Sequence, residues 1–415
     1  MSPLHYRGGA LHLEEVALAT VAERFGTPCY VYSRAAIEAA YRAYDAAFGA
    51  RAHRVCYAVK ANSNLAVLNL LARLGAGFDV VSGGELARVL RAGGRAERVV
   101  FSGVGKRADE LRAALAAGIA CFNVESVAEL ERLNAVALEM GRVAPVALRV
   151  NPDVDAGTHP YISTGLRTNK FGIPAEQAPA LYRRAASLPG LRVHGIACHI
   201  GSQLTDLAPL REAATRIAAL REALAADGIA IGQVDLGGGL GIAYRDEPVP
   251  SQAEYVAAIS APFAGTAVEI SIEPGRSIVG PAGVLLTQVE YLKPGAERNF
   301  AIVDAAMNDL LRPALYDAYH DVLPLRETGG VAQVWELVGP VCESGDFLAH
   351  ARRLALAQGD LLALRDAGAY GFAMSSNYNT RPRPAEVMID GERVHLIRAR
   401  EMLDDLWRGE ALLAE

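Results

Sequence analysis

Between residues 54 and 275 the sequence alternates short apolar segments with longer Ala/Leu/Arg-rich segments. The longer segments, for example 84–92 and 210–226, have helical spacing, and the short ones have the length of buried strands. Strict alternation favours a parallel sheet, and eight repeats favour closure into a (β/α)8 barrel, with an open doubly wound sheet as the alternative. The predicted strands are 54–60, 78–82, 98–103, 121–126, 146–151, 193–199, 233–236 and 267–273.

The pattern changes on both sides of this region. After Gly275 helical runs are few, and strand-like segments dominate. Residues 28–32 also resemble a strand. We therefore predict an α/β barrel over 33–276 and a β-rich domain, of sandwich or barrel type, formed by 1–32 and 277–415. The later predicted strands are 283–291, 300–304, 331–338 and 360–365.

One connection within the predicted barrel is unusually long. It follows the fifth strand and covers residues 153–172. Because long loops in compact domains usually carry function, we expect this one to contribute to a site.

Composition and charge narrow the function class. The formal net charge of -6 argues against a nucleic-acid or anionic-membrane footprint. There is no apolar run long enough to cross a membrane, and the first residues lack the plan of a signal peptide. The 5 cysteines have no close pairs, which suggests neither disulfides nor a metal site. The sequence is therefore typical of a cytoplasmic enzyme with reduced thiols.

The first predicted strand ends on Lys60. Strand alternation places Cys56 and Ala58 on the same face, so the amine would extend into space lined by small side chains. A lysine with few polar neighbours loses proton affinity and becomes a nucleophile. Lys60 is therefore a candidate Schiff-base lysine.

Other reactive groups are predicted at the same rim, since the carboxyl ends of barrel strands lie together. The glycine run 237–241 does not fit the dinucleotide fingerprint, because Ile242 stands where its third glycine belongs. Beside a Schiff-base lysine, however, its N–H groups suit a phosphate. The rim set is Lys60, Asp79, His199, Ser202, Gly237, Gly238, Gly239, Glu273 and Arg276.

These groups match the needs of pyridoxal 5′-phosphate. An imidazole such as His199 can stack on its ring, and a carboxylate such as Glu273 can keep its pyridine nitrogen protonated. The rim therefore predicts a pyridoxal-phosphate enzyme.

Several separated motifs resemble those of the diaminopimelate decarboxylase family, of the fold-type III pyridoxal-phosphate enzymes. The resemblance runs from about Pro28 to Trp407. One departure is Ala306, where the family usually has glycine, and we expect it to shift the local backbone without changing the chemistry. The motifs are Tyr57–Asn62, Phe78–Glu85, His159–Leu166, His199–Gln203, Asp235–Gly241, Glu273–Arg276, Met307–Tyr316, Cys342–Asp346, Ala369–Gly371 and Tyr378–Pro384.

The resemblance implies a role for each matching residue. Lys60 would bind the cofactor, His199 would stack on its ring and Glu273 would contact its pyridine nitrogen. Cys342, supplied by the partner subunit, would reprotonate the α-carbon. The implied phosphate contacts are Ser202, Gly238, Gly275, Arg276 and Tyr370. The implied substrate contacts are Arg276, Arg312 and Tyr316 for the distal carboxylate, Glu343 for the distal ammonium, and Tyr370.

The implied reaction is decarboxylation of meso-2,6-diaminopimelate to L-lysine and CO2, the last step of lysine biosynthesis, by a homodimer with active sites at its interface. Three alternatives stay open. A related decarboxylase would act on ornithine, arginine or carboxynorspermidine, but Arg312 and Glu343 favour an amino-acid distal end. An alanine racemase would place an arginine, rather than Glu273, at the pyridine nitrogen. A non-catalytic binding protein on the same scaffold would not need to retain together Lys60, His199, Glu273 and Cys342.

Overall fold

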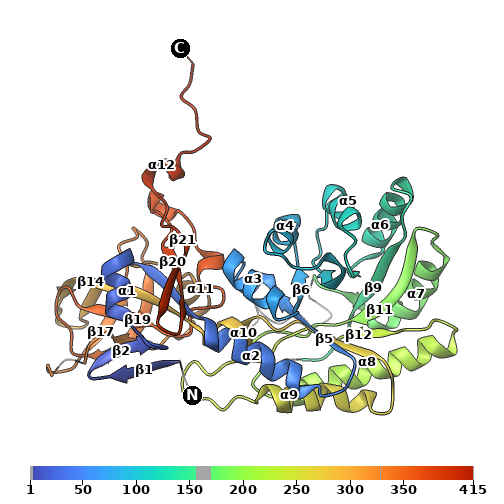
Figure 1. Ribbon diagram of the computed structural model, residues 1–415, viewed down its shortest axis with the longest axis horizontal. Helices are drawn as coiled ribbons and strands as arrows, with labels where there is room; N and C mark the ends of the chain where they lie inside the picture. The colour runs from blue at the N-terminus through green and yellow to red at the C-terminus, as the bar shows by residue number, and fades with distance from the viewer. Residues whose placement is uncertain (1–2, 156–169, 328, 415) are drawn as a thin grey trace. The chain divides into compact units, whose positions relative to one another are not determined.

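The computed structural model describes residues 3–155, 170–327 and 329–414, and it divides into two compact units (Figure 1). The barrel unit consists of Glu38–Ala243 and Pro248–Ser277. The β unit consists of Met1–Ile37, Tyr244–Glu247 and Ile278–Glu415.

The barrel unit contains the predicted (β/α)8 barrel. Its eight main strands all pair in parallel, and the last strand, β13, pairs with the first, β5. This closure confirms the barrel and excludes the open sheet, in which the two edge strands would stay unpaired. The strands are β5 (His53–Ala58), β6 (Gly77–Val80), β7 (Val99–Phe101), β8 (Cys121–Val124), β9 (Ala144–Asn151), β11 (Leu191–Ala197), β12 (Gln233–Asp235) and β13 (Glu269–Ile272), with the short β10 (Ile173–Pro174) added beside β9.

Helices follow the strands along the chain, as the alternating pattern predicts. A cluster of small and β-branched side chains is buried on strands β5, β7, β8, β9 and β11; it comprises Cys56, Val100, Cys121, Ala147 and Ala197. Serine side chains cap several helices, and the Ser82 hydroxyl accepts the N–H of Glu85 at the start of α4. The helices are α2 (Arg34–Ala47), α3 (Leu65–Arg73), α4 (Gly83–Arg91), α5 (Ala108–Ala117), α6 (Val127–Glu139), α7 (Ala178–Ser187), α8 (Ala208–Ala226), α9 (Gln252–Ser260) and α10 (Arg276–Val279).

The β unit is built on a nine-stranded sheet in which segments far apart in sequence pair. The N-terminal strand β4 (Cys29–Ser33) lies between β14 (Gly283–Lys293) and β20 (Ala385–Asp390), so the strand predicted at 28–32 belongs to the β-rich part. The remaining strands of this sheet are β15 (Phe300–Val303), β16 (Val322–Pro324), β17 (Gln333–Val338), β18 (Phe347–Leu354), β19 (Leu361–Leu364) and β21 (Arg393–Arg398).

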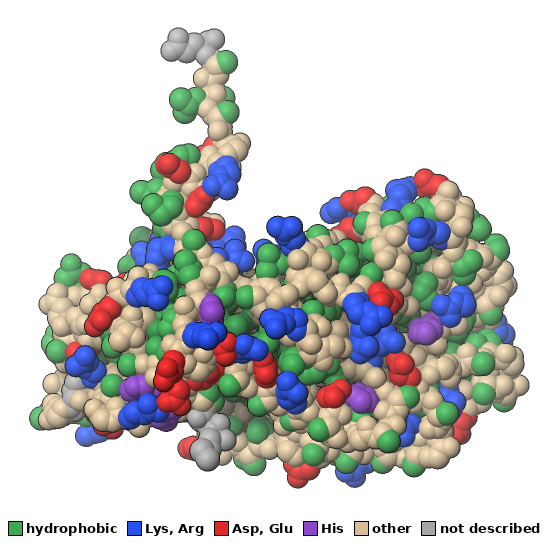
Figure 2. Space-filling view, viewed as in Figure 1, with side chains coloured by type: hydrophobic (Ala, Val, Ile, Leu, Met, Phe, Trp, Pro, Cys, Tyr) green, Lys and Arg blue, Asp and Glu red, His purple; other side chains and the backbone are tan. Residues whose placement is uncertain are grey.

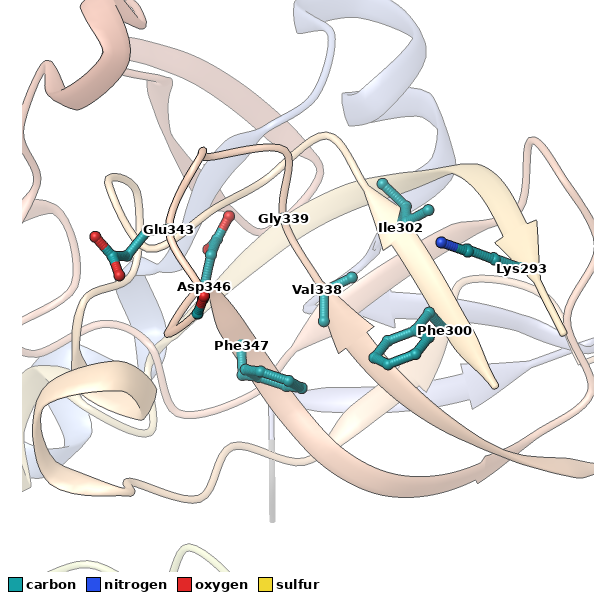
Figure 3. Close-up of a pocket in the computed structure, with 9 residues that line it drawn as sticks. Lys293, Phe300, Ile302, Val338, Gly339, Glu343, Asp346 and Phe347 are labelled. Carbon is teal, nitrogen blue, oxygen red and sulfur yellow. The ribbon is translucent and has the colours of Figure 1, made fainter. Parts of the chain in front are cut away.

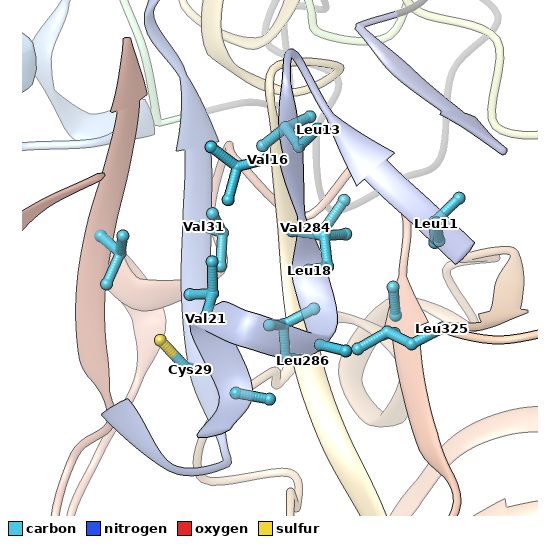
Figure 4. Packing of buried hydrophobic residues seen from close by; sticks show 14 of the residues in the cluster. Leu11, Leu13, Val16, Leu18, Val21, Cys29, Val31, Val284, Leu286 and Leu325 are labelled. Atoms are coloured by element: carbon cyan, nitrogen blue, oxygen red, sulfur yellow. The ribbon is translucent and has the colours of Figure 1, made fainter. Parts of the chain in front are cut away.

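A smaller three-stranded sheet and helix α1 cover this sheet with apolar side chains. Figure 4 shows Leu13, Val31 and Leu286 packed in one cluster with residues of α1 (Leu18–Phe25). Burial of this apolar surface joins the N-terminal residues to the rest of the unit. The other elements are β1 (Leu4–Arg7), β2 (Ala10–Leu13), β3 (Val16–Ala17), α11 (Arg312–Tyr316) and α12 (Leu403–Leu406).

Within the described residues no helix is long and apolar enough to span a membrane. Figure 2 shows hydrophobic side chains along the C-terminal segment, where Leu412 and Leu413 are almost fully exposed. The His159–Leu166 motif and most of the long connection at 153–172 fall outside the described residues.

Candidate active site

Lys60 lies just beyond its strand rather than on it. Strand β5 ends at Ala58, and Lys60 occupies a 3₁₀ turn over Val59–Ala61. The Tyr57 hydroxyl donates to the Asn62 carbonyl and holds this turn. The prediction of a strand through residue 60 is therefore wrong at its end, because the chain turns before the alternation reaches Lys60.

The amine of Lys60 has a polar neighbour. Its Nζ lies 3.2 Å from Oδ2 of Asp79, which is fully buried in β6, whereas the lysine side chain is 39% exposed. The expectation of few polar neighbours is therefore wrong on this side. Among the described residues, Oδ1 of Asp79 has no hydrogen-bond partner, so the buried carboxylate retains unused capacity to accept.

Glu273 belongs to a cluster of acidic groups at the ends of strands. Burial raises its pKa well above the usual range, the carboxyls of Asp235 and Asp79 add to this, and Lys60 opposes it. Burial also raises the pKa of Asp235. The side-chain amide of Asn123 bridges the pair, with Nδ2 3.4 Å from Asp235 Oδ2 and 3.5 Å from Glu273 Oε1.

His199 follows β11 and is held as a neutral ring. The backbone N–H of Gly238, which can only donate, bonds to its Nδ1 at 3.2 Å. The proton of the neutral imidazole must then be on Nε2. Burial lowers the pKa of His199 well below its usual range, and Lys60 and Arg149 lower it further. A neutral, oriented imidazole suits stacking on an aromatic ring.

The glycine run after β12 allows three backbone segments to approach closely. A Cβ on Gly238 would lie 2.2 Å from the Glu273 carbonyl oxygen, and one on Gly239 would lie 2.6 Å from the Gly201 carbonyl oxygen. Gly239 also has a φ of +113°, which disfavours side chains. Only glycine therefore fits this loop.

Two of the predicted phosphate-binding N–H groups are already used inside the protein. That of Gly237 donates to Asp235 Oδ1 and that of Gly238 to His199. They shape the rim and orient His199. Nearby, the guanidinium of Arg276 donates to the Ser202 hydroxyl at 3.2 Å, which places a cation and a hydroxyl together.

Gly275 is equally restricted. A Cβ there would lie 2.9 Å from that of Ala61 and 3.1 Å from that of Ala58, so the turn bearing Lys60 packs on this glycine. The barrel unit thus brings together at one rim the residues predicted there: Lys60, Asp79, His199, Ser202, Gly237, Gly238, Gly239, Glu273, Gly275 and Arg276.

Sequence reasoning did not single out Asn123, and it named Asp235 only as the first residue of a family motif. Both are buried polar residues in short barrel strands, Asn123 in β8 and Asp235 in β12. That signal was available, because buried polar side chains at the carboxyl ends of barrel strands usually serve the site.

The β unit carries the remaining predicted residues. Arg312 and Tyr316 are the first and last residues of α11, and Arg312 is buried. Tyr370 is partly buried and has a φ of +57°. Cys342 and Glu343 are exposed on the turn after β17.

Asp346 and Asn379 hold the turn that bears Cys342. The buried carboxylate of Asp346 accepts the N–H of Val341 at 2.8 Å and that of Met307 at 2.6 Å, while Asn379 accepts the N–H of Cys342 at 2.8 Å. Glu343 and Asp346 line a pocket of about 290 Å³ in the β unit. Figure 3 shows both side chains there.

Ala306 is accommodated by a neighbouring glycine. A Cβ on Gly339 would lie 2.6 Å from both Cα and Cβ of Ala306. The missing side chain at 339 leaves room for the methyl group at 306.

Comparisons with known proteins agree with this geometry. A family model described as "Pyridoxal-dependent decarboxylase, pyridoxal binding domain" matches residues 34–280. A diaminopimelate decarboxylase of Pseudomonas aeruginosa is 60% identical over 415 residues, all of both chains. The chain belongs to the diaminopimelate decarboxylase family.

Solved structures of the family share the whole fold. A diaminopimelate decarboxylase from "m. jannaschii", in co-complex with L-lysine, matches with a TM-score of 0.95 and 39% identity, covering 99% of this chain and 98% of that one. A lysine/ornithine decarboxylase from Vibrio vulnificus, complexed with putrescine, matches less well, with a TM-score of 0.80, 25% identity and coverage of 90% and 97%.

The cofactor of this family is pyridoxal phosphate, and the barrel rim fits it. The carboxyls of Asp79, Asp235 and Glu273 form an acidic cluster that a protonated pyridine nitrogen would relieve. His199 offers a neutral ring, and Arg276 with Ser202 offers a cation and a hydroxyl suited to phosphate.

Proposed function

We propose that this chain decarboxylates meso-2,6-diaminopimelate to L-lysine and CO2 with pyridoxal phosphate. The observation that carries the proposal is the cluster of buried carboxyls around Glu273. Burial and the neighbouring carboxyls raise the pKa of Glu273, and the nearby amine of Lys60 opposes that rise. When bound, pyridoxal phosphate supplies a protonated ring that accepts the electron pair left by departing CO2. Glu273 would hold the proton on that ring, because the protonated ring would supply the positive charge that a buried carboxylate beside Asp235 and Asp79 requires.

The other barrel residues would bind and orient. Lys60 would supply the amine that fixes the cofactor, with Asp79 holding that amine through the contact of 3.2 Å. His199 would lie against the ring. Arg276 and Ser202 would hold the phosphate together with Gly239, whose N–H, unlike those of Gly237 and Gly238, has no acceptor among the described residues.

The β unit would recognise the distal end of the substrate. Arg312 and Tyr316 would bind its carboxylate, to which Arg276 and Tyr370 would contribute, and Glu343 would bind its ammonium. The guanidinium group suits a carboxylate because it can donate two parallel hydrogen bonds. Cys342 would donate the proton to the α-carbon.

We further infer that the enzyme works as a cytoplasmic homodimer, in which 33–276 bind the cofactor and 1–32 with 277–415 provide the substrate and interface residues. Exposure of Cys342 and Glu343 supports the dimer, since a second copy would cover both. The 5 cysteines of the sequence all lie in described segments and are free thiols, which suits a reducing compartment.

The test is CO2 release from purified enzyme given meso-diaminopimelate, L-lysine or L-ornithine, with chiral analysis of the amino-acid product. We expect turnover of meso-diaminopimelate with L-lysine as product, and little release from the other two. A site with a buried arginine for a distal carboxylate discriminates against a substrate lacking it by roughly 10²-fold or more. Equal rates on ornithine would reassign the enzyme to the related basic amino-acid decarboxylases.

A further inference from the structure

Arg312 is held from two sides inside the β unit. Its Nη1 lies 3.0 Å from Nε2 of His320, which is fully buried. Its guanidinium carbon also lies 4.8 Å from the ring centroid of Tyr244. Both partners attract a cation without carrying a charge themselves. His320 does so through a nitrogen lone pair and Tyr244 through the face of its ring.

The protonation state of His320 follows from its two contacts. Its Nδ1 lies 2.7 Å from the carbonyl oxygen of Arg365, which can only accept, so Nδ1 carries the proton. Its Nε2 faces Arg312, which can only donate, so Nε2 carries the lone pair. His320 is therefore a neutral imidazole with one defined tautomer.

His320 and Tyr244 are themselves fixed in place. Their rings meet edge to face, with centroids 5.5 Å apart and planes at 80°. The Glu247 carboxylate accepts the N–H of Tyr244 at 2.8 Å, and Arg352 donates to the His320 carbonyl oxygen at 3.0 Å. The aromatic pair thus forms a rigid support for one guanidinium.

We propose that His320 and Tyr244 are positioning residues that set the enzyme's specificity for a distal carboxylate by orienting Arg312. The inference rests on the proposed function, in which Arg312 binds that carboxylate. A carboxylate in place of His320 would also orient the guanidinium. It would, however, compete with the substrate's carboxylate for the positive charge of Arg312. A neutral acceptor orients Arg312 without adding to the negative charge of Asp366, whose carboxyl already interacts with the same guanidinium.

Two substitutions separate the two contacts of the imidazole. In His320→Asn the amide reaches the position of Nδ1, so it can still donate to Arg365, but it no longer reaches Arg312 to accept from it. In His320→Gln the amide reaches the position of Nε2 and can accept from Arg312. The glutamine variant is therefore the matched control for the asparagine variant.

The probes are inhibition constants for L-lysine, which has the distal carboxylate, and cadaverine, which lacks it. In His320→Asn we expect the constant for lysine and KM for meso-diaminopimelate to rise about tenfold, as loss of a charge-assisted hydrogen bond does. The constant for cadaverine and kcat should change by less than about twofold, and His320→Gln should recover most of the lysine affinity.

A double-mutant cycle tests whether His320 acts through Arg312. In an Arg312→Ala background, His320→Asn should change kcat/KM by less than about twofold, because the group that it orients is gone. An equal loss in both backgrounds would overturn the proposal, as would equal weakening of lysine and cadaverine.

Tyr244 gives a second test that does not depend on folding of the His320 variants. Tyr244→Leu should weaken lysine selectively, and Tyr244→Phe, which keeps the ring face, should not. Unchanged lysine binding in Tyr244→Leu would count against the proposal. Failure of the proposed function would instead show in the wild-type enzyme, as lack of turnover of meso-diaminopimelate.

Discussion

Lys60, in the turn that follows β5, forms an ion pair with Asp79 of the neighbouring strand β6, with 3.2 Å between Nζ and Oδ2. Asp79 pairs in register with Ala58, the last residue of β5, so the sheet itself places the carboxylate beside the turn that carries the lysine. The pair marks where the cofactor is expected to attach.

Replacing this lysine should remove activity. Lys60→Ala takes away the amine that we propose fixes the cofactor, so CO2 release from meso-diaminopimelate should fall to background. Reduction of the wild type with borohydride, followed by peptide mass analysis, should find the pyridoxyl group on Lys60. The control is Lys293→Ala, at an exposed lysine of the β unit, which should stay active. An active Lys60→Ala enzyme would refute this assignment.

Neutralising Glu273 should slow chemistry more than it weakens binding. Glu273→Gln removes the carboxylate that we propose holds the proton of the cofactor ring, and loss of such aligned electrostatic stabilisation costs about 10²–10³ in kcat. Steady-state kinetics and the absorption spectrum of the loaded enzyme together separate slow turnover from cofactor loss. Near-normal kcat in a fully loaded variant would contradict the proposed role.

A methyl group at Gly238 should distort the rim. Its Cβ would lie 2.2 Å from the Glu273 carbonyl oxygen, so one of the two backbone segments must move. We expect Gly238→Ala to lose about 1–3 kcal/mol of unfolding free energy, as overpacking does, and to bind the cofactor more weakly. Gly232→Ala is the control, since a Cβ there meets nothing within 4 Å. Equal stability and cofactor affinity in the two variants would contradict the close approach.

The buried carboxyl of Asp309 should make stability depend on pH. Burial raises its pKa to about 7, whereas an unfolded aspartate titrates near pH 4. The folded state therefore prefers the protonated form, and this contribution is present below about pH 4 and lost as the pH rises through about 7. Between pH 5 and pH 8 the unfolding free energy of the wild type should fall by about 1 kcal/mol or more beyond any fall in Asp309→Asn. Urea unfolding at a series of pH values measures this difference. Asp404→Asn, at an exposed position, should follow the wild-type slope, and an unchanged slope in Asp309→Asn would contradict the prediction.

Complementation should reveal whether Cys342 acts across a dimer interface. Lys60→Ala and Cys342→Ala should each be inactive alone. Dissociated and reassociated together, they should form mixed dimers with one intact site and regain part of the wild-type activity. Mixed dimers that are detected by mass but stay inactive would place Cys342 in its own subunit's site, or outside the chemistry.

Local sequence patterns were sufficient to predict the position of a residue where that position depends only on its place along a strand. The eight barrel strands follow from apolar segments at regular intervals, and the carboxyl ends of parallel strands must share one rim, which is why His199 and Glu273 could be placed there. The pattern failed at Lys60, because the turn after Ala58 depends on the packing of Ala58 and Ala61 against Gly275, more than 200 residues away.

The sequence by itself determined the barrel and the set of groups at its rim, because period, spacing and residue type are local properties, and its motifs indicated the family by resemblance. Only the tertiary structure decided how those groups bond to one another. Asn123 bridges Asp235 and Glu273, and a neutral His320 holds Arg312, through contacts between strands and loops that no local pattern records. Such contacts fix protonation and orientation, since these depend on which donor or acceptor the fold places within about 3.5 Å.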